Sequence, residues 1–242
     1  MKIVAKTDVG MVRESNQDSY TTGELPNGVA WAVVCDGMGG AAGGNGASST
    51  AVKVIAEQIT SSFRPGMSAK SIKNMMVSAI NAANISVYDI SCSNSELYGM
   101  GTTVVCAIVM EHTAYIAHAG DSRAYIVSHG ALNQLTRDHS VVQELVEHGK
   151  ITALEAKRHP NKNIITRAVG VSREILVDFC EQEMKDGDVL LLCTDGLTNF
   201  VESDEMCDLT KDDMFYEFAE RLVDRANKNG GGDNVTVVAV TY

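Results

Sequence analysis

WAVVCDGMGG, residues 31–40, is the stretch that decides the fold of this chain. Its apolar residues fall on both sides of the pleat, which indicates a strand covered on both faces. Asp36 stands where the strand ends, and the glycines that follow allow the backbone to turn sharply. The stretch therefore predicts a carboxylate held at the edge of a buried sheet.

The same arrangement recurs at three later points. The apolar run 189–193 leads to an Asp-Gly pair, and the glycines 230–232 place another aspartate before the closing apolar run 235–240. A Gly-Asp pair also follows the apolar run 113–119. Carboxylates in such positions suit hard divalent cations, which prefer oxygen ligands. The candidate ligands are Asp36, Asp195 and Asp233, with Asp121 as a candidate for an additional ion.

The balance of charge limits the classes of partner. The chain has 242 residues, with 20 lysines and arginines against 31 aspartates and glutamates, and a formal net charge of −11. This balance argues against nucleic acid or an anionic membrane as the main partner. The length suits one large domain or two small ones, and no linker or repeat divides the chain. We therefore expect a single domain over residues 1–242 that acts as a monomer.

We expect the protein to be cytoplasmic. The chain starts with strand-like sequence rather than a signal peptide, and no apolar run approaches the roughly 20 residues that crossing a bilayer requires. The cysteines show no CxxC spacing, which is typical of buried thiols in a reducing compartment. The histidines show no HxH or HExxH spacing, so we assign none as a metal ligand. His118, within an apolar run, is expected to be a hydrogen-bonded core residue.

Helices and strands occur in blocks along the chain. Two helices, a run of antiparallel strands and two more helices indicate sheets packed together with helices outside. A polar, helix-forming segment at about 139–165 is interpreted as a flap over the site. Besides the apolar runs above, the expected strands are 2–9, 102–110, 123–127, 132–135 and 175–183, and the expected helices are 49–62, 68–90, 203–209 and 212–227.

A polar loop, residues 10–18, supplies two further candidates. The guanidinium of Arg13 suits a phosphate group, because it is planar and donates two parallel hydrogen bonds. A solvated surface arginine is the alternative interpretation. Asp18 is expected to orient a metal-bound water or to fix a neighbouring residue. The alternative is a turn cap, since Asn-Gln-Asp-Ser is favourable turn chemistry.

Six short motifs follow one another along the chain. They are Arg13-x-x-Asn16-Gln17-Asp18, Asp36-Gly37-Met38-Gly39-Gly40, Gly101-Thr102-Thr103, Gly120-Asp121-Ser122-Arg123-Ala124, Asp195-Gly196-Leu197-Thr198 and Gly232-Asp233-Asn234-Val235-Thr236. In this order they resemble the metal-dependent protein phosphatases, the type 2C serine/threonine class, and most closely its compact bacterial members. Each motif alone is weak, because Asp-Gly is common in turns. Six in order, over essentially the whole chain, are specific.

The resemblance implies an α+β fold, a four-layer α-β-β-α sandwich with two central antiparallel β-sheets flanked by helices. It also implies a centre of two Mn²⁺ or Mg²⁺ ions at one edge of the sheets. Asp36 would bridge the two ions, and the carbonyl of Gly37 would bind the second. Asp195 and Asp233 would complete the first, and Asp121 would join Asp195 in holding a weaker third ion.

The same resemblance implies a reaction. Arg13 would bind the substrate phosphate, and Asp18 would support the metal-bound waters. A water or hydroxide that bridges the two ions would hydrolyse phosphoserine and phosphothreonine, with no covalent enzyme intermediate. The expected partners are phosphorylated proteins and a bacterial Ser/Thr kinase that the enzyme opposes.

Three positions depart from the pattern of the family. Met38 and Ala41 stand where some relatives carry histidines, so protonation of the leaving serine oxygen is unassigned. Asn199 replaces an aspartate near Asp195, which bears on the third ion. Two alternatives to an active protein phosphatase follow: a phosphoprotein-binding protein without turnover, and a two-metal hydrolase of another ester such as a phosphodiester.

Overall fold

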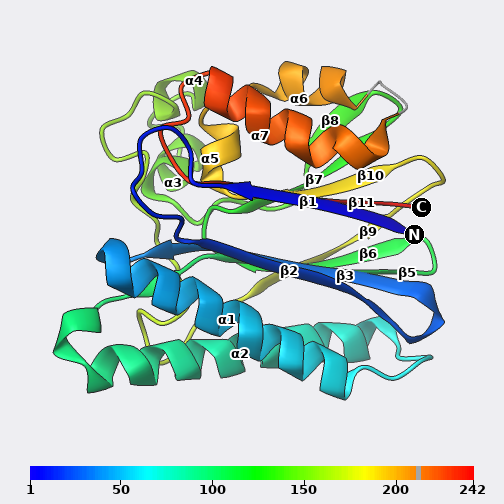
Figure 1. The fold of residues 1–242 in the computed structure, drawn as a ribbon, viewed down its shortest axis with the longest axis horizontal. Helices are drawn as coiled ribbons and strands as arrows, with labels where there is room; N and C mark the ends of the chain where they lie inside the picture. Colours follow the sequence, from blue (N-terminus) through cyan, green and yellow to red (C-terminus); the bar gives the residue numbers. More distant parts are fainter. Residues whose placement is uncertain (211–213) are drawn as a thin grey trace.

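Two antiparallel β-sheets lie face to face, and helices cover their outer faces (Figure 1). The computed structural model describes residues 1–210 and 214–242, with the side chains of Ala41 and Ala42 outside the described set. The expected four-layer α-β-β-α sandwich is confirmed. Both chain termini lie at one end of the sandwich, opposite the end that carries the loops described below.

Every pair of neighbouring strands in the two main sheets is antiparallel. The first sheet has the order β1 (Lys2–Asp8), β11 (Val235–Thr241), β10 (Val189–Cys193), β7 (Arg123–Ser128) and β8 (Ala131–Gln134). The second has the order β2 (Asp18–Leu25), β3 (Val29–Met38), β5 (Val104–Met110), β6 (Thr113–Ala119) and β9 (Asp178–Glu183), and β4 (Gly101–Thr102) pairs with the end of β3.

The helices are distributed over the two outer faces and one end of the sandwich (Figure 1). The second sheet is covered by α1 (Gly40–Ser62) and α2 (Ala69–Ser93), and the first by α6 (Ser203–Leu209) and α7 (Phe218–Lys228). At the loop end lie α3 (Val141–Glu147), α4 (Ala153–Ala156) and α5 (Asp195–Thr198). Single 3₁₀ turns occupy Pro26–Gly28, Ser95–Leu97 and Phe215–Glu217. Within the described residues, none of the helices combines the length and the apolar character that a membrane span needs.

Three apolar layers hold the four structural layers together. Strand β3 shows how the sequence produces them, because its successive side chains alternate between two layers. Val33 and Cys35 pack with the helices α1 and α2, whereas Ala32 and Val34 pack between the two sheets. The strand is therefore buried on both faces, as its apolar residues predict. The third layer joins the first sheet to α6 and α7.

Helix α1 begins at Gly40, nine residues before the start that we expected from the glycine-rich sequence. Glycine is a poor helix former, yet close packing requires it here. A Cβ atom on Gly44 would lie 2.7 Å from Oε1 of Gln17 and 2.8 Å from the carbonyl oxygen of Gly37. The first turn of the helix therefore approaches the end of β3 more closely than any other residue would allow.

Other boundaries also differ from expectation. Asp18 is not in a loop but is the first residue of β2, which pairs with β3 over its full length. The sequence of β2 is largely polar and gives a weak strand signal. Strand β9 starts at Asp178 rather than 175. The expected helix 212–227 is replaced by a 3₁₀ turn and α7, and the start of that expectation lies outside the described residues.

Candidate metal centre and active site

All the predicted site residues except Asp18 line one cavity of about 550 Å³. It lies where the ends of β3 and β10 meet the loops that contain residues 10–17, 120–122 and 230–234. Two residues of the expected flap, Asn163 and Ile165, also line it. Among the predicted residues, those that line the cavity are Arg13, Asp36, Gly37, Asp121, Asp195 and Asp233.

Asp36 is fixed at the end of β3 by two threonines. Its backbone N–H donates to Oγ1 of Thr103 at 2.9 Å. Its carbonyl oxygen accepts from the backbone N–H of Thr103 at 2.9 Å and from Oγ1 of Thr102 at 2.8 Å. The backbone from which the Asp36 carboxylate projects is therefore held through both its N–H and its carbonyl oxygen.

Asp195 and Asp233 come from segments that touch each other. A Cβ atom on Gly196 would lie 1.8 Å from the carbonyl oxygen of Asn234, so only glycine allows this approach. One oxygen of Asp195 accepts from Nδ2 of Asn199 at 2.9 Å, whereas its Oδ1 is buried without a hydrogen-bond partner. One oxygen of Asp233 accepts from the N–H of Asn234 at 2.8 Å.

Arg13 reaches the same centre from the first loop. Its Nη2 lies 2.8 Å from Oδ2 of Asp233, and its side chain is 53% exposed. The guanidinium is thus at the mouth of the cavity, where a phosphate group would enter. Pairing with a candidate metal ligand also places the arginine next to the ions that Asp233 would hold.

Asp18 lies beneath the cavity and is 7% exposed. Its Oδ2 accepts from Oγ1 of Thr194 at 2.9 Å and from Oγ1 of Thr236 at 2.7 Å. Its Oδ1 is buried and has no partner. Sequence patterns assigned no role to either threonine, although Thr194 directly precedes the motif of Asp195 and Thr236 ends the motif of Asp233. They orient a carboxylate that the sequence placed at the centre.

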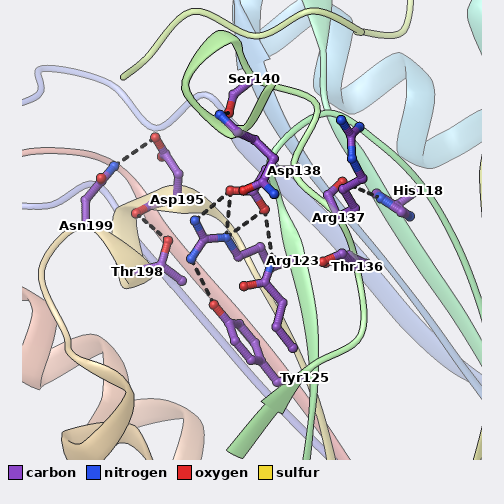
Figure 2. A network of polar contacts seen from close by, with 12 residues as sticks. His118, Arg123, Tyr125, Thr136, Arg137, Asp138, Ser140, Asp195, Thr198 and Asn199 are labelled. Atoms are coloured by element: carbon purple, nitrogen blue, oxygen red, sulfur yellow. Dashed lines mark hydrogen bonds and ion pairs between the residues drawn. The ribbon is translucent and has the colours of Figure 1, made fainter. Parts of the chain in front are cut away.

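Asp121 follows β6 in a tight turn. Oγ of Ser122 lies 2.7 Å from Oγ1 of Thr103, which joins this turn to the end of β3. Directly after the turn, Arg123 donates from Nε and Nη2 to the carboxylate of Asp138 at 2.6–3.0 Å, beside Asp195 and Asn199 (Figure 2). The ion pair anchors the start of β7 below the turn.

The carboxyl groups of the centre oppose one another's ionisation. Burial raises the pKa of Asp18 and of Asp121 to about 7 in each case. Burial and then the charge of Asp18 raise the pKa of Asp36 well above its ordinary value. Burial and then the charge of Asp233 raise the pKa of Asp195. Divalent cations would relieve this mutual opposition, and they would also give partners to the two buried carboxylate oxygens that lack them. The residues therefore fit a metal centre.

A second group of potential ligands lies outside the cavity. One ligand atom each from His118, His139 and Asp178 lie within 4.8 Å of one another. The guanidinium of Arg167 already occupies this space, with Nη1 2.7 Å from Asp178 and 3.1 Å from His139. The guanidinium already supplies positive charge here, so the group is better explained as an ion-pair network than as a metal site. His118 is 3% exposed and its Nε2 lies 2.9 Å from the carbonyl oxygen of Arg137, so it is the core histidine that we expected.

Comparison with known proteins identifies the family. A family profile described as Protein phosphatase 2C matches residues 12–236, nearly the whole chain. The chain belongs to the protein phosphatase 2C family. The match spans all four candidate metal-binding aspartates and confirms the resemblance that the motifs indicated.

Individual relatives within the protein phosphatase 2C family agree over the full length. The serine/threonine phosphatase stp of Listeria monocytogenes is 38% identical over 236 residues, which cover 97% of this chain and 93% of the relative. The structure of a serine/threonine phosphatase of S. agalactiae superposes with a TM-score of 0.93 at 32% identity, covering 100% of this chain and 99% of that one. The catalytic domain of the phosphatase PstP, solved in complex with two manganese ions, gives a TM-score of 0.85 at 32% identity, with 98% and 96% covered.

The departures from the family pattern have local consequences. Met38 lines the cavity, and its Cε lies 2.8 Å from the position that a Cβ on Gly101 would take. A thioether has no proton to donate, so Met38 cannot act as a general acid. Asn199 donates a hydrogen bond to Asp195 where an aspartate would instead add negative charge.

Proposed function

We propose that this protein is a Mg²⁺- or Mn²⁺-dependent protein phosphatase that hydrolyses phosphoserine and phosphothreonine in phosphorylated proteins. The observation that carries the proposal is the convergence of Asp36, Asp121, Asp195 and Asp233 on one cavity with Arg13 at its mouth. The named activity of relatives that match nearly the whole chain supports it.

The residues of the centre would hold two core ions and a weaker third. Asp36 would bridge the core pair, Gly37 would offer its carbonyl oxygen to one ion, and Asp195 and Asp233 would complete the other. Asp121 would share the third ion with Asp195. When bound, two divalent cations supply a water of lowered pKa and neutralise charge on the phosphoryl oxygens.

The side chains of the protein supply binding and orientation. Arg13 binds the phosphoryl oxygens through parallel hydrogen bonds once they enter the cavity. Asp18, held by Thr194 and Thr236, offers its unpartnered Oδ1 as a hydrogen-bond acceptor to water in the centre. No histidine is among the described residues that line the cavity, and we propose water as the proton donor to the leaving serine oxygen.

Residues 1–242 are proposed to form one catalytic domain with a flap at about 139–165. The position of Asn163 and Ile165 in the cavity lining supports the flap assignment. We further propose that the enzyme opposes a Ser/Thr kinase and acts as a monomer in the cytoplasm.

The test is hydrolysis of a phosphothreonine peptide by wild type and by Asp36→Asn, with Mn²⁺ and with EDTA. Phosphate release by wild type only with Mn²⁺, and its loss in the variant, would support the proposal. A folded wild type that binds Mn²⁺ but releases no phosphate would overturn it. Strong preference for a phosphodiester over the peptide would point to a different ester as substrate.

A further inference from the structure

We propose that His139 is a positioning residue that fastens the base of the flap to the turn carrying Asp121, and thereby sets the affinity of the third ion site. The inference rests on the proposed function, because it takes Asp121 as a ligand. It adds a residue that neither the motifs nor the cavity lining includes.

His139 binds both polar groups of the Gly120 backbone. The backbone N–H of His139 donates to the carbonyl oxygen of Gly120 at 3.0 Å, and its ring Nδ1 accepts from the backbone N–H of Gly120 at 3.0 Å. Gly120 immediately precedes Asp121 and has φ of +114°, a conformation that favours glycine. The turn that aims the Asp121 carboxylate is therefore held by a single residue on this side.

The other side of the turn leaves no room for movement. A Cβ atom on Gly120 would lie 2.7 Å from Cβ of Thr103, the residue that also fixes Asp36. If the bonds to His139 were lost, the turn could only move away from Thr103 and from the rest of the centre. The expected consequence is a weaker third site with the core pair of ligands intact.

The same histidine closes the base of the flap. Its carbonyl oxygen accepts from the N–H of Thr166 at 2.7 Å. The next residue, Ser140, forms a β-bridge with Ile165, which lines the cavity. One residue thus connects the turn of Asp121 with both ends of the flap, so movement of the flap is coupled to the position of Asp121.

The ring of His139 is held in one orientation and one tautomer. Its side chain is fully buried and stacks on His118 with ring centroids 4.8 Å apart and planes within 3°. Because Nδ1 accepts from Gly120, the proton of the neutral ring is on Nε2, which donates to Asp178 at 3.2 Å. Nη1 of Arg167 lies 3.1 Å from the same Nε2, and with this tautomer it donates to Asp178 at 2.7 Å rather than to the ring. Burial lowers the pKa of His139, which favours the neutral ring that this arrangement requires.

Two amide substitutions separate the two functions of the ring. In His139→Asn the amide oxygen takes the place of Nδ1 and can still accept from Gly120. In His139→Gln the amide reaches the place of Nε2 and can contact Asp178 but not Gly120. Both variants lose the imidazole and its stacking, so the difference between them reports the bond to Gly120. Asp178→Asn is a milder variant that loosens the ring from its half-exposed side.

Two measurements are made on wild type and these variants, with Asp121→Asn as the reference for a lost third site. The first is hydrogen exchange of the Gly120 amide in metal-free protein. The second is calorimetric titration with Mn²⁺, which resolves the weakest binding step. For His139→Gln we expect roughly tenfold faster exchange and roughly tenfold weaker binding in that step, as loss of one buried hydrogen bond predicts. For His139→Asn we expect near wild-type values, and for Asp178→Asn an intermediate loss.

Equal exchange and equal third-step affinity in wild type and His139→Gln would overturn the inference while leaving the proposed function intact. Equal losses in His139→Asn and His139→Gln would also overturn it, because the ring would then act only through packing. If both fail to fold, an unchanged third step in Asp178→Asn would decide against it. Absence of any Mn²⁺ binding by folded wild type would instead refute the proposed function and this inference together.

Discussion

Asp18 and Asp36 lie directly opposite each other in the ladder between β2 and β3. Burial raises the pKa of both carboxyl groups, and the charge of Asp18 raises that of Asp36 further. The fold therefore brings together carboxyl groups that oppose each other's ionisation in metal-free protein. Stability is lost at the place where metal binding is expected.

Replacement of Asp36 by asparagine should stabilise the metal-free protein at neutral pH. A carboxyl group with a raised folded-state pKa keeps its proton when the unfolded chain, with a pKa near 3.8, has lost it. Wild type therefore loses stability as the pH rises above about 4, and the loss levels off above the folded-state pKa. We expect Asp36→Asn to gain on the order of 2 kcal/mol at pH 7.5 in EDTA.

Urea denaturation of both proteins in EDTA at several pH values measures this gain. Burial lowers the pKa of His118 and of His139, which gives an opposite slope below pH 6.5, but both proteins share it and it cancels in the difference. A difference that stays flat or shrinks from pH 5 to pH 7.5 would contradict the prediction.

Metal should stabilise wild type and leave Asp36→Asn almost unchanged. A ligand that binds only the folded state adds about 2.7 kcal/mol at a concentration 100 times its Kd. Thermal melts with Mn²⁺ and with EDTA should therefore differ by several degrees for wild type. An equal rise in Tm for both proteins would show that Mn²⁺ binds elsewhere, for example near His118.

Substitution of Arg13 should weaken phosphate binding without weakening metal binding. Arg13→Ala removes the guanidinium at the mouth of the cavity, and we expect kcat/KM for a phosphopeptide to fall about 100-fold, mainly through KM. Arg13→Lys should recover part of the loss. Because Arg13 pairs with Asp233, its removal frees a ligand, so Mn²⁺ affinity should stay equal or rise. A fall in Mn²⁺ affinity would assign Arg13 to the structure of the centre instead.

Asn199→Asp should strengthen the third ion site. The substitution replaces a hydrogen-bond donor to Asp195 with a second carboxylate beside it. We expect the weakest Mn²⁺ binding step to tighten about tenfold, since added carboxylates favour hard cations, and metal-free stability to fall. Mn²⁺ titration with Asp121→Asn as the negative control tests this. No change in the weak step would remove residue 199 from the third site.

Breaking the Arg123–Asp138 ion pair should destabilise the protein, because removal of Arg123 leaves the carboxylate of Asp138 without its cation. Asp138 is 8% exposed, and we expect Arg123→Met to cost about 3 kcal/mol. The exposed pair Lys157–Glu202 is the matched control, and Lys157→Met should cost less than about 1 kcal/mol. Similar costs for both, measured by urea denaturation, would contradict the assignment of a buried pair.

Much of the fold could be predicted because its strands carry local signals. Strand β3 is apolar on both faces, and the aspartates and glycines at strand ends stand in a recognisable order. Strand β2 and the start of α1 were not predicted, because polar and glycine-rich residues give no local signal there. Their structure depends on pairing with β3 and on the close approach of Gly44 to Gly37.

The sequence by itself determined the layered architecture, the family and the identity of the carboxylates, since these follow from local composition and motif order. Only the tertiary structure decided which groups meet. Thr194 and Thr236 reach Asp18 from 176 and 218 residues away, and His139 holds Gly120 through the fold of the flap. Such contacts depend on strand register and on the packing of two sheets, which no short stretch of sequence encodes.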